Sequence, residues 1–95
     1  MTFRQIIEFS TSRIDDFNAY FDDWITASEG DRIPHRAVLQ ADRDAENVYL
    51  LTVEFSSHEL AMENSARPET DAFAKKMSEL VDGSVAYGNY DVVEG

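Results

Sequence analysis

Two hydrophobic patterns alternate along the chain. Four short segments rich in β-branched and aromatic residues show apolar and polar positions in alternation, which is typical of half-buried strands. They span Phe3–Ser10, His35–Asp42, Val48–Phe55 and Val85–Val93. Between the first two segments, Ile14, Phe17, Phe21 and Trp24 recur every three or four residues, so they lie on one face of a predicted helix that ends near Gly30.

The expected helix starts carry polar residues at the spacing of a capping box, in which each side chain bonds a backbone N–H of the first turn. The capping pairs are Ser12 with Asp15 and Ser56 with Glu59. Arg67 and Pro68 then interrupt the helix that follows Ser56. Because proline fits the first turn of a helix, a further helical segment is predicted from Pro68 to Gly83, and the second helical region is bent at Pro68.

The order of these elements is strand, helix, strand, strand, helix, strand. Residues 43–47 are polar and few, as expected for a hairpin loop between the two middle strands. Right-handed crossovers then place the first and third strands at the centre of a four-stranded antiparallel sheet. We therefore predict an α+β protein with a ferredoxin-like βαββαβ arrangement. Residues 1–95 are expected to form a single domain, with both helical regions on one face of the sheet.

The alternation along the third strand assigns its two faces. Tyr49, Leu51, Val53 and Phe55 are large and apolar, so they are expected to face the helices. Carrying the alternation to the other strands places a mixed set of side chains on the uncovered face. This set is Arg4, Ile6, Glu8, Arg36, Val38, Gln40, Leu50, Thr52, Glu54, Tyr87 and Asn89. Its apolar members would form an exposed patch, so we expect a second copy of the sheet to cover it in a homodimer, giving a dimeric α+β barrel.

Charged residues on this face admit two interpretations. In the register set by the hairpin, Glu54 lies near Arg36 and, across the central strand pair, near Arg4. An Arg-Glu-Arg structural ion cluster is the first interpretation. Contact with a ligand held inside the barrel is the alternative.

The charge of the chain restricts its partners. The formal net charge is −11, from 19 acidic and 8 basic side chains, so the surface field repels nucleic acid and anionic membranes. Neither is expected as a partner. The first ten residues lack a basic segment followed by an apolar signal core, and a cytoplasmic location is expected.

Few residues suggest a specific chemistry. There is no cysteine, and neither His35 nor His58 stands in a metal-binding motif, so no metal site is expected. The glycines form no phosphate-binding loop, so no nucleotide cofactor is expected. Trp24 suits either the core or a ligand stack. Asn64 precedes the bend at Pro68, where a broken helix can direct a polar side chain into a cavity.

The segment FSSHELAMENSARPETDAFAKKMSELVDG, followed by VAYGNYDVVEG, resembles the second half of the dimeric α+β barrel superfamily. The similarity is greatest to small proteins related to antibiotic-biosynthesis monooxygenases. It implies a homodimer with facing sheets and a pocket between sheet and helices. Some such proteins oxidise aromatic polyketides without metal or flavin. Asn64 corresponds to an Asn of that branch, but the Trp that accompanies it there is missing. Haem-degrading members carry an Asn on the first strand, where this chain has Arg4 and Gln5.

Two functional hypotheses follow. The first is a non-catalytic dimeric module whose acidic exterior meets a protein partner. The alternative is a cofactor-independent, monooxygenase-like enzyme or a binding protein for a small aromatic molecule. Its pocket would be lined by Trp24, Asn64, Tyr87 and Tyr90. The sequence leaves open whether any reaction is catalysed.

Overall fold

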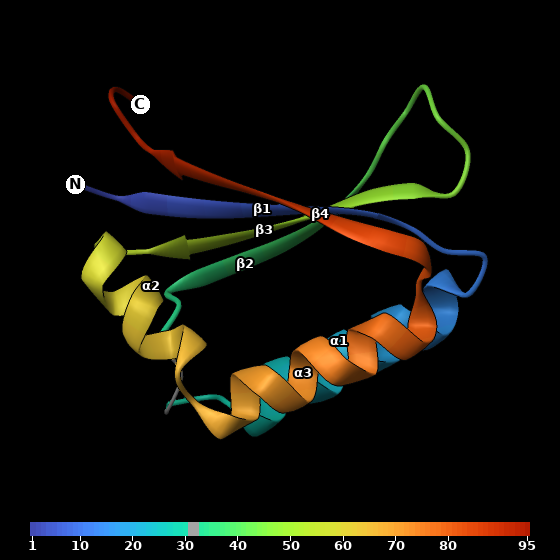
Figure 1. Ribbon diagram of the computed structural model, residues 1–95, viewed down its shortest axis with the longest axis horizontal. Helices are drawn as coiled ribbons and strands as arrows, with labels where there is room; N and C mark the ends of the chain where they lie inside the picture. The colour runs from blue at the N-terminus through green and yellow to red at the C-terminus, as the bar shows by residue number, and fades with distance from the viewer. Residues whose placement is uncertain (31–32) are drawn as a thin grey trace.

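The computed structural model describes residues 1–30 and 33–95. Its strands are β1 (Phe3–Ser10), β2 (Arg36–Ala41), β3 (Val48–Phe55) and β4 (Asp82–Asp91), and its helices are α1 (Ile14–Ala27), α2 (His58–Ser65) and α3 (Pro68–Leu80). The predicted order of elements is confirmed, with the second helical region divided into α2 and α3 (Figure 1).

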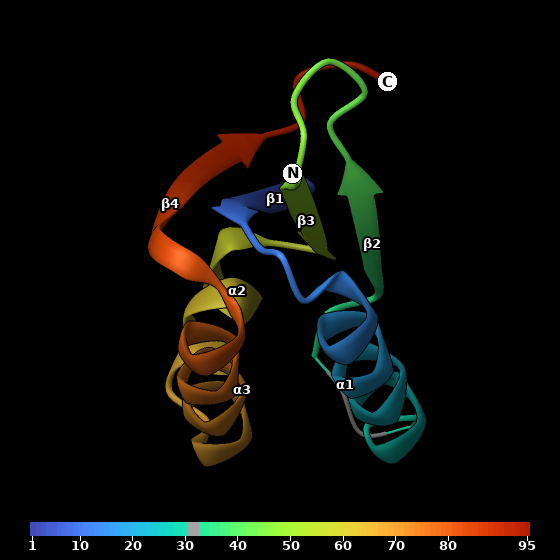
Figure 2. The same ribbon diagram turned by 90° about the vertical axis from the view of Figure 1, so that its right-hand side faces the viewer.

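The four strands form one antiparallel sheet in the order β2-β3-β1-β4, which confirms the ferredoxin-like α+β arrangement. α1 and α3 run side by side beneath the sheet, and α2 descends from the sheet to the start of α3 (Figures 1 and 2). The helices all lie on one side of the sheet. The opposite side, called the open face below, is left bare by the described chain.

The core lies between the sheet and the helical layer. Phe9 of β1 and Phe17 of α1 stack with their ring centroids 4.6 Å apart, and Leu51 of β3 belongs to the same cluster. All three are nearly inaccessible to solvent. Burying side chains of this size contributes about 1.5–3 kcal/mol each. The apolar residues that alternate along the strands and those that recur along the helices therefore pack together in one core.

The strand register arranges the open face in three rows that cross the sheet from β2 to β4. The first row is Arg36, Glu54, Arg4 and Tyr90; the second is Val38, Thr52, Ile6 and Gly88; the third is Gln40, Leu50, Glu8 and Ala86. Paired residues of neighbouring strands point to the same side of a sheet. The predicted assignment of β1, β2 and β3 side chains to this face is therefore confirmed.

The assignment of β4 is corrected. Tyr87 pairs with Ile7, which is buried against the helices, and Asn89 pairs with Gln5. Tyr87 and Asn89 therefore lie on the helix side of the sheet and not on the open face. The physical reason is that no tight turn fixes the register of β4, and a slip of one residue moves every side chain to the other face.

The predicted capping residues are also shifted. α1 begins after Arg13, without a side-chain cap, while the Ser12 N–H donates to Asp82 Oδ2 at 2.8 Å. The cap of α2 is Ser57, whose hydroxyl accepts from the Leu60 N–H, and not Ser56. In both cases the strand ends where the sequence predicts, at Ser10 and Phe55, and the helix begins one residue later than the capping pair suggests.

The predicted bend at Pro68 is confirmed as a break between two helices. Arg67 has extended backbone angles, φ −78° and ψ 141°, and Pro68 occupies the first turn of α3. Extended backbone before proline avoids a clash with the proline ring. Within residues 1–30 and 33–95, no helix has the length and apolar character needed to cross a bilayer.

Candidate functional site

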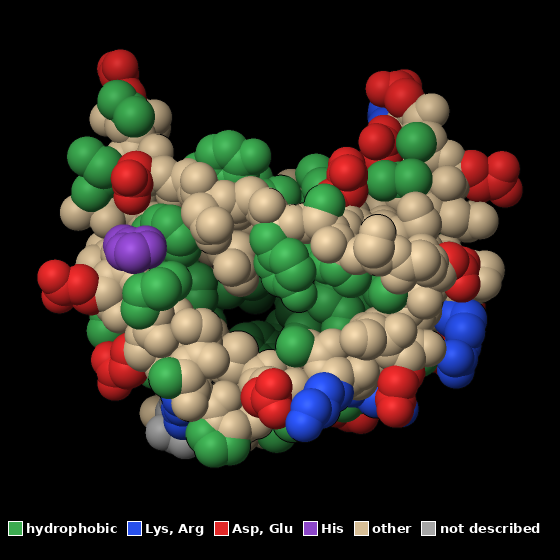
Figure 3. Space-filling view, viewed as in Figure 1, with side chains coloured by type: hydrophobic (Ala, Val, Ile, Leu, Met, Phe, Trp, Pro, Cys, Tyr) green, Lys and Arg blue, Asp and Glu red, His purple; other side chains and the backbone are tan. Residues whose placement is uncertain are grey.

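Two neighbouring pockets lie at the end of the helical layer where α1 finishes and α3 begins. The outer pocket has a volume of about 380 Å³ and lies among the helices; its lining is Tyr20, Asp23, Trp24, Ala27, Ser28, Asn64, Arg67, Glu69, Thr70 and Ala72. The inner pocket, of about 70 Å³, lies between sheet and helices and includes Gln5, Phe21, Leu51, Val53 and Phe73. Trp24, Asn64 and Thr70 line both pockets. Figure 3 shows a hollow lined by hydrophobic side chains between the sheet and the helical layer.

Aromatic side chains of α1 and α3 form the apolar wall of these pockets. Trp24 meets Phe73 edge to face, with ring centroids 5.6 Å apart, and stacks on Phe21 at 6.2 Å. Tyr20 lies 5.4 Å from Phe73. The three-and-four spacing along α1 therefore places Trp24 partly in the core and partly at the pocket wall, so the two interpretations of Trp24 from the sequence are compatible.

Asn64 supplies the polar group at the junction of the two pockets. It lies in the last turn of α2, where its carbonyl accepts the Arg67 N–H at 3.1 Å across the helix break. Within the described part of the chain, the Asn64 side-chain amide has no hydrogen-bond partner. The N–H and oxygen of this amide are therefore available to a ligand. Asn64 lies at the pocket because the break at Pro68 ends α2 beside it.

The inner pocket can orient a ligand but offers little acid–base chemistry. Its polar lining consists of the amides of Gln5 and Asn64 and the hydroxyl of Thr70. None of these groups exchanges a proton readily near neutral pH. Chemistry in this pocket would depend on the reactivity of the bound molecule itself. Among the described residues, no three His, Asp or Glu side chains are grouped as a metal would require.

Sequence analysis missed Thr70. It lies three residues before Phe73 and seven before Met77, so helical spacing alone placed it on the same face of α3. A hydroxyl within an apolar stripe gives no separate signal in the sequence, so Thr70 could not be assigned to a pocket before α3 was placed.

Tyr87 and Tyr90 lie apart from these pockets. Tyr87 is on the helix side of the edge strand β4 and is 56% exposed. Tyr90 is on the open face and is 55% exposed. Its ring lies over Gly88, where an added Cβ would come within 2.6 Å of the ring. The structure thus brings together Trp24 and Asn64 of the four predicted pocket residues, and it does not bring the two tyrosines to them.

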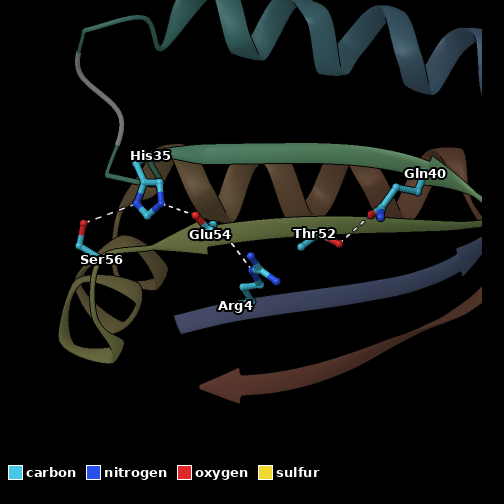
Figure 4. Close-up of polar contacts among 6 residues, drawn as sticks. All are labelled: Arg4, His35, Gln40, Thr52, Glu54 and Ser56. Carbon is cyan, nitrogen blue, oxygen red and sulfur yellow. Dashed lines mark hydrogen bonds and ion pairs between the residues drawn. The ribbon is translucent and has the colours of Figure 1, made fainter. Parts of the chain in front are cut away.

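A second polar site lies on the open face around Glu54. Arg4 Nε is 2.7 Å from Glu54 Oε2, and His35 Nε2 is 2.5 Å from Glu54 Oε1 (Figure 4). We call Arg4, His35 and Glu54 the Glu54 cluster. Hydrogen bonds from Arg4 and then His35 hold the pKa of the Glu54 carboxyl below its ordinary value of 4.5.

The expected Arg-Glu-Arg cluster is therefore formed in part. The pair of Arg4 and Glu54 is present, but His35 makes the second contact with the carboxylate. Arg36 lies opposite Glu54 in the register and lines a shallow depression of about 180 Å³ beside it. His35 reaches the carboxylate because its N–H donates to the Glu54 carbonyl at 3.0 Å, one residue before β2 begins.

Ser56 extends this cluster without making it a hydrolytic site. Its Oγ lies 3.5 Å from His35 Nδ1, at the outer limit of a hydrogen bond (Figure 4). A serine activated by a base normally lies about 2.6–3.2 Å from it. Ser56 also lies outside the pockets described above. We therefore assign these side chains to the structure of the open face.

Comparison with known proteins gives information at the level of fold. No protein-family model matches the sequence, and no curated protein matches it significantly. Solved structures do match. SnoaB, a cofactor-independent oxygenase from Streptomyces nogalater, superposes with a TM-score of 0.81 at 16% identity, over 99% of this chain and 95% of that protein.

Two further solved structures also superpose on this chain. The protein Rv0793 from Mycobacterium tuberculosis gives a TM-score of 0.79 at 16% identity, over 100% of this chain and 98% of that one. A Bordetella bronchiseptica protein provisionally named an antibiotic biosynthesis monooxygenase gives 0.80 at 17% identity, over 98% of each chain. At such low identity the likeness establishes the fold alone. The chain therefore has the fold of the antibiotic biosynthesis monooxygenase-like proteins, as its resemblance in sequence implied.

Proposed function

We propose that the protein binds a small planar aromatic molecule in the outer and inner pockets. The observation that carries this proposal is the unpartnered amide of Asn64 on a pocket wall shared with Trp24. An aromatic face can stack on a planar ligand, and an amide can fix its orientation by bonding a carbonyl or hydroxyl group. An apolar lining with a few polar groups is the usual composition of a small-molecule site.

The size of the pockets supports this role. The outer pocket, at about 380 Å³, falls within the range of roughly 300–1,000 Å³ typical of ligand sites. A solved protein of the same fold, SnoaB, is an oxygenase that needs no cofactor. Both points favour a small-molecule role over a non-catalytic module that meets a protein partner.

Binding can be measured through Trp24, the only tryptophan of the chain. Naphthols and related neutral phenols should quench its fluorescence and raise the melting temperature. Asn64→Ala should weaken binding about twofold to tenfold, because it removes a neutral hydrogen bond of about 0.5–1.5 kcal/mol. Asn18→Ala, on the exposed side of α1, is the matched control and should bind like the parent protein. Equal affinities for the two variants would contradict the role of Asn64.

Enzyme and binding protein can be separated by oxygen consumption. A bound naphthol would itself supply the electrons: one atom of dioxygen enters the ring to give the naphthoquinone and the other leaves as water, so no added cofactor is needed. Uptake of oxygen above the protein-free rate, lowered by Asn64→Ala, supports a monooxygenase. Uptake at the protein-free rate with a ligand that binds supports a binding protein. That outcome is also favoured because the described lining of the inner pocket contains no acid or base.

We also propose that the open face pairs with a second copy of the chain. Ile6, Val38 and Leu50 are only partly buried in the single chain, and Tyr90 is exposed. Together they are the apolar part of the open face. A two-fold arrangement of the sheets would remove this apolar surface from water on both copies.

A further inference from the structure

The described residues that line the outer pocket carry a surplus of negative charge. Its lining includes the carboxylates of Asp23 and Glu69 and one cation, Arg67. Arg67 Nε lies 3.2 Å from Glu69 Oε2, so that guanidinium already has a carboxylate partner. Asp23 makes no ion pair with any residue in the described ranges. One lining carboxylate is therefore left without a counter-charge.

The backbone also contributes negative electrostatic potential at the outer pocket. Trp24, Ala27 and Ser28 bring the C-terminal end of α1 to the pocket, and this end of a helix carries partial negative charge. The last turn of α1 contains no basic side chain that would offset it. The net charge of −11 lowers the potential around the whole molecule further.

Aromatic rings stand beside the unpaired carboxylate. Tyr20 lies three residues before Asp23 on α1 and Trp24 directly follows it, and both line the same pocket. The faces of such rings attract organic cations, and the attraction adds to that of a carboxylate. Phosphate groups and carboxylates would instead be repelled from this position.

We propose that the ligand of this site carries a protonated amine, which binds at Asp23 while its aromatic body extends past Trp24 toward the inner pocket. This inference rests on the proposed small-molecule function and specifies the charge of the ligand. The amine donates to the Asp23 carboxylate at the pocket mouth. The polar groups at Asn64 and Thr70 then contact the body of the ligand.

Three ligands with the same ring test this assignment: naphthylmethylamine, naphthylmethanol and naphthoate, measured by calorimetry at neutral pH. The amine should bind about fivefold more tightly than the alcohol, as a partly exposed ion pair with an added ring contribution allows. Naphthoate should bind most weakly. Added salt should weaken binding of the amine and leave that of the alcohol nearly unchanged.

Asp23→Asn should bring the affinities for amine and alcohol to within twofold of each other. Asp22→Asn is the matched control, because Asp22 is the adjacent exposed residue and lies outside both pockets; it should keep the fivefold preference. Equal binding of amine and alcohol by the parent protein, or retention of the preference in Asp23→Asn, overturns the amine assignment while the proposed function stands. Failure of all three ligands to bind overturns the proposed function together with it.

Discussion

Thr11 illustrates how much one small side chain contributes at the residue scale. It is fully buried; its hydroxyl donates to the Leu80 carbonyl at 2.6 Å and accepts from the Arg13 N–H at 2.9 Å. The hydroxyl thus bonds one backbone group at the start of α1 and one at the end of α3. Thr11 and Leu80 are 69 residues apart in the sequence. The bond to Leu80 is buried, so water is no ready substitute for it, while the bond from Arg13 is partly buried.

Thr11→Val should therefore lower the free energy of unfolding by about 1–3 kcal/mol, because it keeps the shape of the side chain but leaves buried polar groups without partners. Denaturation in urea would measure the change. Thr11→Ser keeps the hydroxyl and should lose less stability than Thr11→Val. If the valine variant were as stable as the serine variant, packing rather than hydrogen bonding would explain the role of Thr11.

The lowered pKa of Glu54 predicts that the free energy of unfolding depends on pH. Its folded-state pKa is lowered below 4.5 by Arg4 and His35, so its contribution is present above pH 4.5 and is lost as the pH falls through the lowered value. Glu54→Gln should melt at a lower temperature than the parent protein at neutral pH, since Arg4 would lose its counter-charge. The difference between the two melting temperatures should shrink as the pH falls below 4.5. A difference that stays constant across this range would contradict the ion-pair explanation.

At the scale of elements, most of the fold could be predicted from the sequence because each element follows a strict period. β1, β3 and α1 have the apolar spacing that their common core requires, and the break at Pro68 follows from the chemistry of proline. β4 was harder, because its register depends on how α3 returns the chain to the sheet. The pairing of β1 with β4 also shifts between Glu8 and Ser10, which local alternation cannot reveal.

The candidate site was only partly predictable for a related reason. Trp24 and Asn64 lie on or beside regular helices, so their spacing and the nearby break indicated the pocket. His35 lies before β2, and its contact with Glu54 depends on one backbone hydrogen bond beyond the strand. Asp23 belongs to no motif in the sequence, and it lines a pocket because α3 and the helix break enclose the space beside it. Tertiary packing, rather than any local pattern, made these residues part of a site.

At the scale of the whole molecule, the proposed dimer predicts a clear change in mass. Sedimentation of the parent protein at micromolar concentration should give twice 10.8 kDa. Ile6 lies in the middle row of the open face, so Ile6→Lys would place two extra charges within the interface and should give particles of 10.8 kDa.

Met62→Lys serves as the control, because Met62 is an exposed apolar residue of α2 on the helix side. It should leave the mass of the dimer unchanged. A parent protein that sediments as a monomer throughout this concentration range would rule out the pairing of open faces, while leaving the pockets among the helices unaffected.

The hydrogen bond of Thr11 to Leu80 has a mechanical consequence for ligand entry. It joins the beginning of α1 to the end of α3, and the bond from the Ser12 N–H to Asp82 reinforces the same corner. The outer pocket lies at the other end of this helix pair, where α1 finishes and α3 starts. At the pocket end, ring contacts of Tyr20 and Trp24 with Phe73 join the two helices. We expect these contacts to yield more readily than the buried hydrogen bond at Thr11, so that admission of a ligand would shift the pocket end of the helix pair more than the Thr11 corner.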